Sequence, residues 1–204
     1  IYSIENFLTT RRLMYWQVYL HRTAVGYEKV LVNLLKRSKA ARNKAMWSEL
    51  APPLRYFLEH DVDARWFKDH PEALQMYAEL DDSDIWSAMK TWKYSDDPIL
   101  SLLATDMLDR HLFHVEVRDE PPSQEEVNAI RRDIAHAAGV SEEDANYLMY
   151  VAEIGKDMYN PADDSIGILY KDGTVKDIAE ASEILNVQLL SKKIRKYYLC
   201  YQRI

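Results

Sequence analysis

Four side chains near the N-terminus have the types and the spacing to hold a row of phosphates. Arg11, Tyr15, Tyr19 and Arg22 follow one another at intervals of four, four and three residues. On a helix these intervals place the side chains along one stripe, which covers about 16 Å of helix axis. Guanidinium groups clamp phosphates, and tyrosines bond to phosphate oxygens or pack on a sugar or base. One interpretation of this arginine–tyrosine stripe is therefore a binding site for a nucleotide or another phosphate ester.

A packing role fits the same spacing. In that interpretation the two tyrosines and Trp16 lie in a hydrophobic core, while the arginines are solvated or paired with acids. Both interpretations agree with the pattern of residues, and they differ in whether the tyrosine rings reach solvent.

A second group of residues has ligand types that suit a hydrolytic metal ion. His60 and Asp61 are adjacent, with His21 upstream and Asp109 downstream. Imidazole and carboxylate ligands bind such metals. However, residues 59–66 read as a helix end in acidic, loop-like sequence, and a His-Asp pair is common by chance. We therefore interpret the pair as a solvated helix end and predict no metal site, no cofactor and no catalytic residue within these 204 residues.

Two further features have simpler interpretations. The acidic run from Asp81 to Asp84 could chelate a divalent ion, but it fits better as a helix start, with Asp82 or Ser83 as the cap and acids near the helix dipole. Cys200 lies in a predicted strand without a nearby histidine pattern, so we expect it to be unreactive.

Long-range helical periodicity is expected to position the stripe. Residues 3–39 contain no proline, and their apolar residues recur near the helical period, so we predict one long helix. Proline, aspartate and apolar patterns then predict a bundle of shorter helices at 42–50, 54–60, 71–80, from 82 or 83 to about 92, and 98–110.

The pattern changes after about residue 111. We predict strands at 112–117, 146–154 and 197–201, and helical segments at 123–138, 141–145, 179–185 and 187–194. Asp172-Gly173 between two apolar runs predicts a hairpin over 166–178. The expected fold is mostly α and then α+β: a helical segment at 1–111 and a smaller lobe with an antiparallel sheet at 112–204.

Composition limits the classes of protein. The chain has 204 residues, 48% of them hydrophobic, and a formal net charge of −7, which argues against sequence-specific nucleic-acid binding. No stretch approaches the roughly 18 apolar residues of a membrane span. The single cysteine excludes an internal disulfide and suggests a reducing compartment, so we expect a cytoplasmic protein. Residues 1–50 carry nine basic and three acidic side chains, a charge suited to an anionic ligand.

Several blocks resemble the HD-superfamily nucleotide phosphohydrolases, in particular the dNTP triphosphohydrolases of the SAM/HD-domain type and their bacterial relatives. The blocks that carry the resemblance are Ile4-Glu5-x-Phe7-Leu8, Arg11-x-x-Met14-Tyr15-x-x-Val18-Tyr19-x-His21-Arg22, Leu80–Ile85 with Trp92 and Asp97, and Leu108-x-Arg110-x-Leu112-Phe113. The resemblance implies that the family's divalent-metal ligands precede Ile1. Together with the missing initiator methionine, this leads us to expect a piece of a longer chain.

The resemblance also implies roles for individual residues. Arg11 matches an arginine that contacts substrate phosphate, Tyr19 a tyrosine that packs on the nucleotide sugar, and Arg22 a basic residue that is usually lysine. The vertebrate relative has histidine at the position of Tyr15 and a sugar-reading glutamine at the position of Leu20.

A possible effector site follows from the same resemblance. Arg110 matches an arginine of the family's allosteric nucleotide site, and His114 stands where that site has a lysine.

Two functions from different classes remain open. The first is the C-terminal part of a metal-dependent nucleotide phosphohydrolase, which supplies phosphate contacts and oligomer contacts but not the metal. The second is a non-catalytic module that dimerises and binds a protein. In either case the predicted long apolar helix leads us to expect a homo-oligomer.

Overall fold

The computed structural model describes residues 1–41, 45–156, 159, 165–182 and 194–203. Its residue contacts form two units that are interleaved in the sequence. The first unit, unit 1, comprises Ile1–Val25, Val115–Ser123 and Val151–Leu199, and the second, unit 2, comprises Gly26–His114, Gln124–Tyr150 and Cys200–Ile204. The sequence predicts one domain boundary, between residues 111 and 112. The two units are grouped by residue contacts and do not test that boundary, which stays a prediction.

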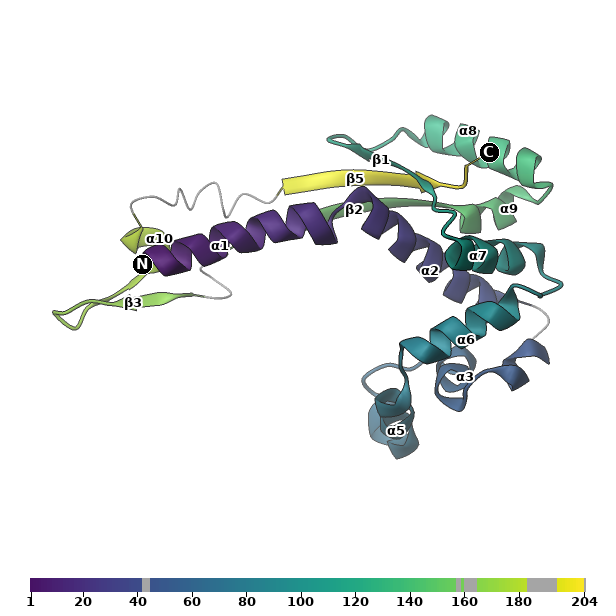
Figure 1. Ribbon diagram of the computed structural model, residues 1–204, viewed down its shortest axis with the longest axis horizontal. Helices are drawn as coiled ribbons and strands as arrows, with labels where there is room; N and C mark the ends of the chain where they lie inside the picture. The colour runs from purple at the N-terminus through teal and green to yellow at the C-terminus, as the bar shows by residue number, and fades with distance from the viewer. Residues whose placement is uncertain (42–44, 157–158, 160–164, 183–193, 204) are drawn as a thin grey trace. The chain divides into compact units, whose positions relative to one another are not determined.

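Helices dominate the first half of the chain (Figure 1). In order they are α1 (Tyr2–Met14), η1 (Tyr15–Tyr19), α2 (Arg22–Ala40), η2 (Ala45–Glu49), α3 (Pro52–Glu59), α4 (Trp66–Asp69), α5 (Pro71–Glu79), α6 (Asp82–Trp92) and α7 (Pro98–Asp109). The second half mixes strands and helices: β1 (His114–Arg118), α8 (Gln124–Ala138), α9 (Glu142–Ala145), η3 (Asn146–Leu148), β2 (Met149–Lys156), β3 (Gly167–Leu169), β4 (Val175–Asp177), α10 (Ile178–Ala181) and β5 (Ile194–Tyr201). The predicted class, mostly α and then α+β, is confirmed.

The single helix predicted for residues 3–39 is wrong, because the chain breaks after Tyr19. η1 is a π-helical turn, in which the amide of Leu20 donates to the carbonyl of Tyr15 at 2.8 Å. Leu20 then leaves the helical region, with φ −99° and ψ 10°. α2 starts afresh at Arg22, and the amide of Thr23 donates to Nδ1 of His21 at 3.3 Å. No proline or glycine marks this break, so apolar periodicity alone does not reveal it.

Local signals set many of the other helix ends. Proline stands in the first turn of α5 and α7, as predicted. α3 starts at Pro52, two residues before the predicted start at Leu54, because proline fits the first turn of a helix. Gly139 follows α8 with φ +65°, a conformation that glycine adopts without strain. The cap of α6 is Asp81, one or two residues earlier than predicted, and it forms a reciprocal capping box with Asp84.

Unit 1 is built from α1, η1, most of β1, β2 and β5, and the C-terminal hairpin. The three longer strands form one sheet in the order β1-β5-β2. β3 and β4 pair antiparallel, with Leu169 opposite Val175, and form the predicted hairpin around Gly173 (φ +84°). α10 and this hairpin lie beside the first turns of α1 (Figure 1), because Leu8 packs with Tyr159 and Ile178 in a small core.

Unit 2 has the larger helical core. Its fully buried side chains include Trp92 of α6 and Leu103 of α7, two helices in extensive contact. Asn33 of α2 is buried, and its amide donates to the carbonyls of Tyr147 and Met149 at 2.9 and 3.1 Å. These bonds hold α2 against the start of β2, where the sequence predicted strand and the structure has the short helix η3 first.

Three predicted segments fall partly outside the described residues. The predicted helix at 42–50 is a 3-10 helix where described, the helix at 179–185 is α10 as far as Ala181, and the helix at 187–194 lies almost wholly outside. Among the described residues, no helix is long and apolar enough to cross a membrane.

Candidate functional site

Three members of the arginine–tyrosine stripe lie next to one another on α1 and η1. The guanidinium carbon of Arg11 is 5.8 Å from the ring centroid of Tyr15. The Tyr15 and Tyr19 ring centroids are 5.2 Å apart, with their planes tilted by 41°. Arg22 is separated from them by the break at Leu20 and begins α2 with an exposed side chain. The structure therefore brings together Arg11, Tyr15 and Tyr19, whereas Arg22 is not part of the same continuous helix.

The two tyrosines differ in burial, which bears on the packing interpretation of each. Tyr15 is half-buried and packs against the small core of Leu8, Tyr159 and Ile178. Tyr19 is 57% exposed. The packing interpretation thus holds in part for Tyr15, while the ring of Tyr19 is open to a ligand.

The turn that carries both tyrosines is unusual in itself. π-helical turns are rare, occur mostly as single turns inside α-helices, and are frequent at functional sites. η1 spans Tyr15–Tyr19, so the wide turn falls on the stripe that the sequence singled out.

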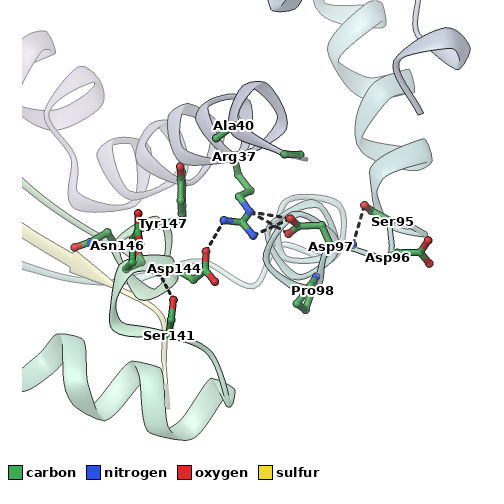
Figure 2. A pocket seen from close by; sticks show the side chains of 12 residues that line it. Arg37, Ala40, Ser95, Asp96, Asp97, Pro98, Ser141, Asp144, Asn146 and Tyr147 are labelled. Atoms are coloured by element: carbon green, nitrogen blue, oxygen red, sulfur yellow. Dashed lines mark hydrogen bonds and ion pairs between the residues drawn. The ribbon is translucent and has the colours of Figure 1, made fainter. Parts of the chain in front are cut away.

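A separate pocket of about 830 Å³ lies within unit 2 (Figure 2). At its wall the guanidinium of Arg37 bonds to Asp97 through Nε at 3.0 Å and through Nη2 at 2.8 Å. Nη1 of Arg37 bonds to Asp144 at 2.5 Å. Burial alone would lower the pKa of Arg37, but the hydrogen bonds that its guanidinium donates to both carboxylates, and their negative charge, outweigh it and raise the pKa above its ordinary value. Arg37 therefore ties α2 to α7 and α9.

The charge of this pocket argues against a phosphate ligand. Asp96 and Glu143 line it with exposed carboxylates, in addition to the two acids that hold Arg37. One cation and four carboxylates leave an excess of negative charge, which repels anions. Among the described residues, we therefore place the phosphate-binding candidate on α1 and η1.

The two residues of the predicted effector site, Arg110 and His114, lie at the end of α7 and the start of β1. Arg110 ends α7 in the left-handed conformation (φ 60°, ψ 35°), and its side chain is exposed. His114 begins β1, and its ring lies 5.0 Å from that of Tyr201.

Near Arg110 lies a carboxyl that the sequence did not suggest. Asp106 is 3% exposed, and its Oδ2 lacks a hydrogen-bond partner among the described residues. Burial raises the pKa of Asp106 to about 6, a rise opposed by the Gln202 hydrogen bond and by His111 and assisted by Asp109. Its position on the inner face of α7, between apolar residues, is the only sequence signal that could have pointed to burial.

Three residues considered as metal ligands, His60, Asp61 and Asp109, interact with other groups of the chain. Asp61 bonds to the ammonium group of Lys39 at 2.5 Å, which lowers the pKa of the carboxyl. Nδ1 of His60 lies 2.9 Å from the carbonyl of Tyr56, and Asp109 pairs with Lys93 at 3.2 Å. Within the described ranges, no three His, Cys, Asp or Glu side chains gather as a metal-binding group.

The structure also shows the surroundings of the acidic run from Asp81 to Asp84 and of Cys200. Within the acidic run, Asp81 accepts from the amide of Ser83 at 2.7 Å, as expected for a helix cap. Cys200 is buried, and burial raises the pKa of its thiol to about 11, which disfavours the reactive thiolate.

Comparison with known proteins places this chain beside a phosphohydrolase. No family model matches the sequence. The chain is 26% identical over 208 residues to YwfO, an uncharacterized protein of Bacillus subtilis, covering 98% of this chain and 45% of that protein. It is similar to the crystal structure of a phosphohydrolase from Bacteroides thetaiotaomicron, with 47% identity and a TM-score of 0.87, covering 99% of this chain and 50% of that one.

These matches define a class of fold. The chain spans about half the length of each relative, and it has the fold of the matching half of a phosphohydrolase.

Proposed function

We propose that this chain is part of a phosphohydrolase, and more narrowly of a metal-dependent nucleotide phosphohydrolase of the HD superfamily, similar to the dNTP triphosphohydrolases. The observation that carries the hydrolase proposal is the 47% identity and TM-score of 0.87 to a phosphohydrolase over 99% of this chain. The narrower proposal rests on the family-like blocks of sequence around the arginine–tyrosine stripe.

In the proposed enzyme, these residues hold the substrate. Arg11 binds phosphate oxygens with two parallel hydrogen bonds, Tyr19 packs on the sugar, and Tyr15 supports both from the core side. Arg22 adds positive charge beyond the turn. The exposure of Tyr19 and the 5.8 Å contact between Arg11 and Tyr15 support this arrangement.

A divalent metal held by residues outside this chain would generate the attacking hydroxide. We therefore propose that these 204 residues alone do not hydrolyse phosphate esters with Mg²⁺, Mn²⁺, Fe²⁺ or Zn²⁺. Turnover by the isolated chain that a His60→Ala variant abolishes would contradict this and would restore the His60–Asp61 metal hypothesis.

The decisive test is the Arg11→Ala variant of the full-length protein. Loss of a charged contact to the reacting phosphate removes on the order of 2–4 kcal/mol of transition-state stabilisation, or about 30- to 1000-fold in kcat/KM. Arg12→Ala is the neighbouring control, since Arg12 lies about 100° further round the helix and both arginines are half-buried. Equal losses of activity in the two variants, or an Arg11→Ala variant that only melts earlier, would refute the assignment.

Arg110 and His114 remain proposed contacts for an effector nucleotide. The exposed side chain of Arg110 supports this, whereas the packing of His114 on Tyr201 leaves its ring less free. Activity that a nucleoside triphosphate stimulates in the natural enzyme but not in Arg110→Ala would support an effector site.

The alternative, a non-catalytic dimerising module, is favoured by one observation. α1 and η1 expose Phe7 (61%), Met14 (43%) and Val18 (57%) at intervals of seven and four residues, so they lie along one face. We propose that this face contributes to a homo-oligomer in either case. Light scattering at micromolar concentration checks it, because a monomer would contradict it. Nucleotide binding that is lost in the Arg11→Ala variant would favour the phosphohydrolase over the non-catalytic module.

A further inference from the structure

The break after η1 exposes a backbone carbonyl that needs a donor. Leu20 has non-helical backbone angles, so its carbonyl is not part of a regular helical ladder. The hydroxyl of Tyr198, in β5, donates a hydrogen bond of 2.7 Å to this carbonyl. Tyr198 is 1% exposed, so its ring is fixed by packing. A buried hydroxyl and an interrupted backbone thus satisfy each other across 178 residues of sequence.

This bond joins the end of the π turn to a rigid strand. The π turn has its own closing bond, from the amide of Leu20 to the carbonyl of Tyr15 at 2.8 Å. Leu20 therefore holds Tyr15 through its amide and Tyr198 through its carbonyl. A second anchor lies at the other end of the same helix, where Ser182 donates a hydrogen bond to the buried Glu5.

We propose that Tyr198 is a positioning residue that maintains the π turn and thereby fixes Tyr19 relative to Arg11 and Tyr15. The proposal rests on the proposed function of the arginine–tyrosine stripe. π turns are rare and occur mostly as single turns inside α-helices, so a contact from outside the helix that holds this turn is a feature to test. If the turn reverted to α-helix, the backbone would rotate progressively along it, by about 100° around the axis at its end for the one residue of difference. Such a rotation would move Tyr19 and Leu20 away from their present positions.

The test is Tyr198→Phe in the full-length protein, which removes the hydroxyl and keeps the ring. Tyr197→Phe is the matched control, because neighbouring residues of a strand point to opposite faces. Two readouts are measured in both variants: hydrogen exchange of a peptide covering residues 15–23, and kcat and KM for a nucleoside triphosphate substrate. Arg11→Ala is assayed alongside.

We expect Tyr198→Phe to speed exchange in the 15–23 peptide and to raise KM about fivefold, the size of one hydrogen bond, with kcat within about twofold. The Tyr197→Phe control should match the natural protein. A purely structural role would lower the melting temperature and the amount of active enzyme without moving KM.

The outcomes separate this proposal from the proposed function. Unchanged exchange in Tyr198→Phe overturns the positioning role directly. Faster exchange with unchanged KM, in an enzyme that Arg11→Ala disables, overturns the positioning role and leaves the proposed function standing. Full activity of Arg11→Ala overturns the proposed function, and the role of Tyr198 in it falls as well.

Discussion

The rings of Tyr15 and Tyr19 lie 5.2 Å apart on the same π turn, yet one faces the core and the other faces solvent. The pair therefore offers a test that separates a role in packing from the proposed role in ligand binding. A role in packing predicts a loss of stability, whereas a role in binding predicts a loss of activity at unchanged stability.

Truncation of each tyrosine should have a different effect. We expect Tyr19→Ala to change the free energy of unfolding by less than about 0.5 kcal/mol, because the ring is mostly exposed. In the proposed longer enzyme it should lower kcat/KM by tenfold or more, since a stacking contact is worth about 1–3 kcal/mol. Tyr15→Ala should reduce both activity and stability. Urea unfolding and steady-state kinetics on the two variants check this, and a destabilised Tyr19→Ala would show that its ring is packed after all.

Adjacent residues of α1 test the small core of unit 1. Leu8 is 2% exposed in contact with Tyr159 and Ile178, so Leu8→Ala should destabilise this unit by about 2–4 kcal/mol. Phe7 is 61% exposed in the single chain, so Phe7→Ala should have an effect below about 0.5 kcal/mol when both variants are measured at a concentration where the chain is monomeric. Fluorescence of Trp16, which packs against this core, reports the transition. Equal effects of the two substitutions would mean that the hairpin does not cover Leu8.

The pairing of Arg37 with Asp97 and Asp144 is expected to stabilise unit 2. The Arg37 side chain is 16% exposed and bonds to two carboxylates, so Arg37→Ala leaves Asp97 and Asp144 close together without a cation. We predict a loss of about 2–3 kcal/mol in the free energy of unfolding. Arg55→Ala is the control, because its 4.0 Å pair with Glu59 is exposed and should be worth less than about 0.5 kcal/mol. Denaturant titration of both variants makes the comparison. An Arg37→Ala variant that loses no more free energy of unfolding than Arg55→Ala would contradict the prediction.

Asp106 predicts a particular dependence of stability on pH. The pKa of its carboxyl is about 6 in the folded chain and 3.8 when unfolded, so the folded state keeps its proton to higher pH. Stability contributed by this group is therefore present below about pH 4 and is lost as the pH rises to about 6.

The Asp106→Asn variant isolates this contribution. An amide carries no charge, and its oxygen can still accept the hydrogen bond that the side chain of Gln202 gives to Asp106. We expect the variant to be more stable than the natural chain at pH 7 by about 1–2 kcal/mol. This is less than the full pKa shift would give, because solvent screens part of the charge. The difference should shrink toward pH 4. Thermal unfolding across this range checks the sign, and a variant less stable at pH 7 would contradict it.

Local physics accounts for much of what the sequence predicted. The prolines at the starts of α5 and α7, the glycine after α8 and the Asp172-Gly173 turn act through their own backbone preferences, so these features could be predicted without knowledge of the fold. The order of helices and strands, and thus the fold class, followed from apolar periodicity. The candidate residues Arg11, Tyr15 and Tyr19 also came from type and spacing alone.

Tertiary structure decided the rest, because it depends on partners far away in the sequence. The break that separates Arg22 from the stripe is stabilised by Tyr198, and the burial of Tyr15 by Tyr159 and Ile178, so neither could be read from residues 1–39. The pairing of Arg37 with Asp97 and Asp144 joins three helices, and the raised pKa of Asp106 comes from the desolvation of a carboxyl by neighbours that the sequence does not place beside it. A pattern along the chain determines which side chains share a helix face, whereas exposure, charge pairing and helix interruptions are set by what the folded chain puts against that face.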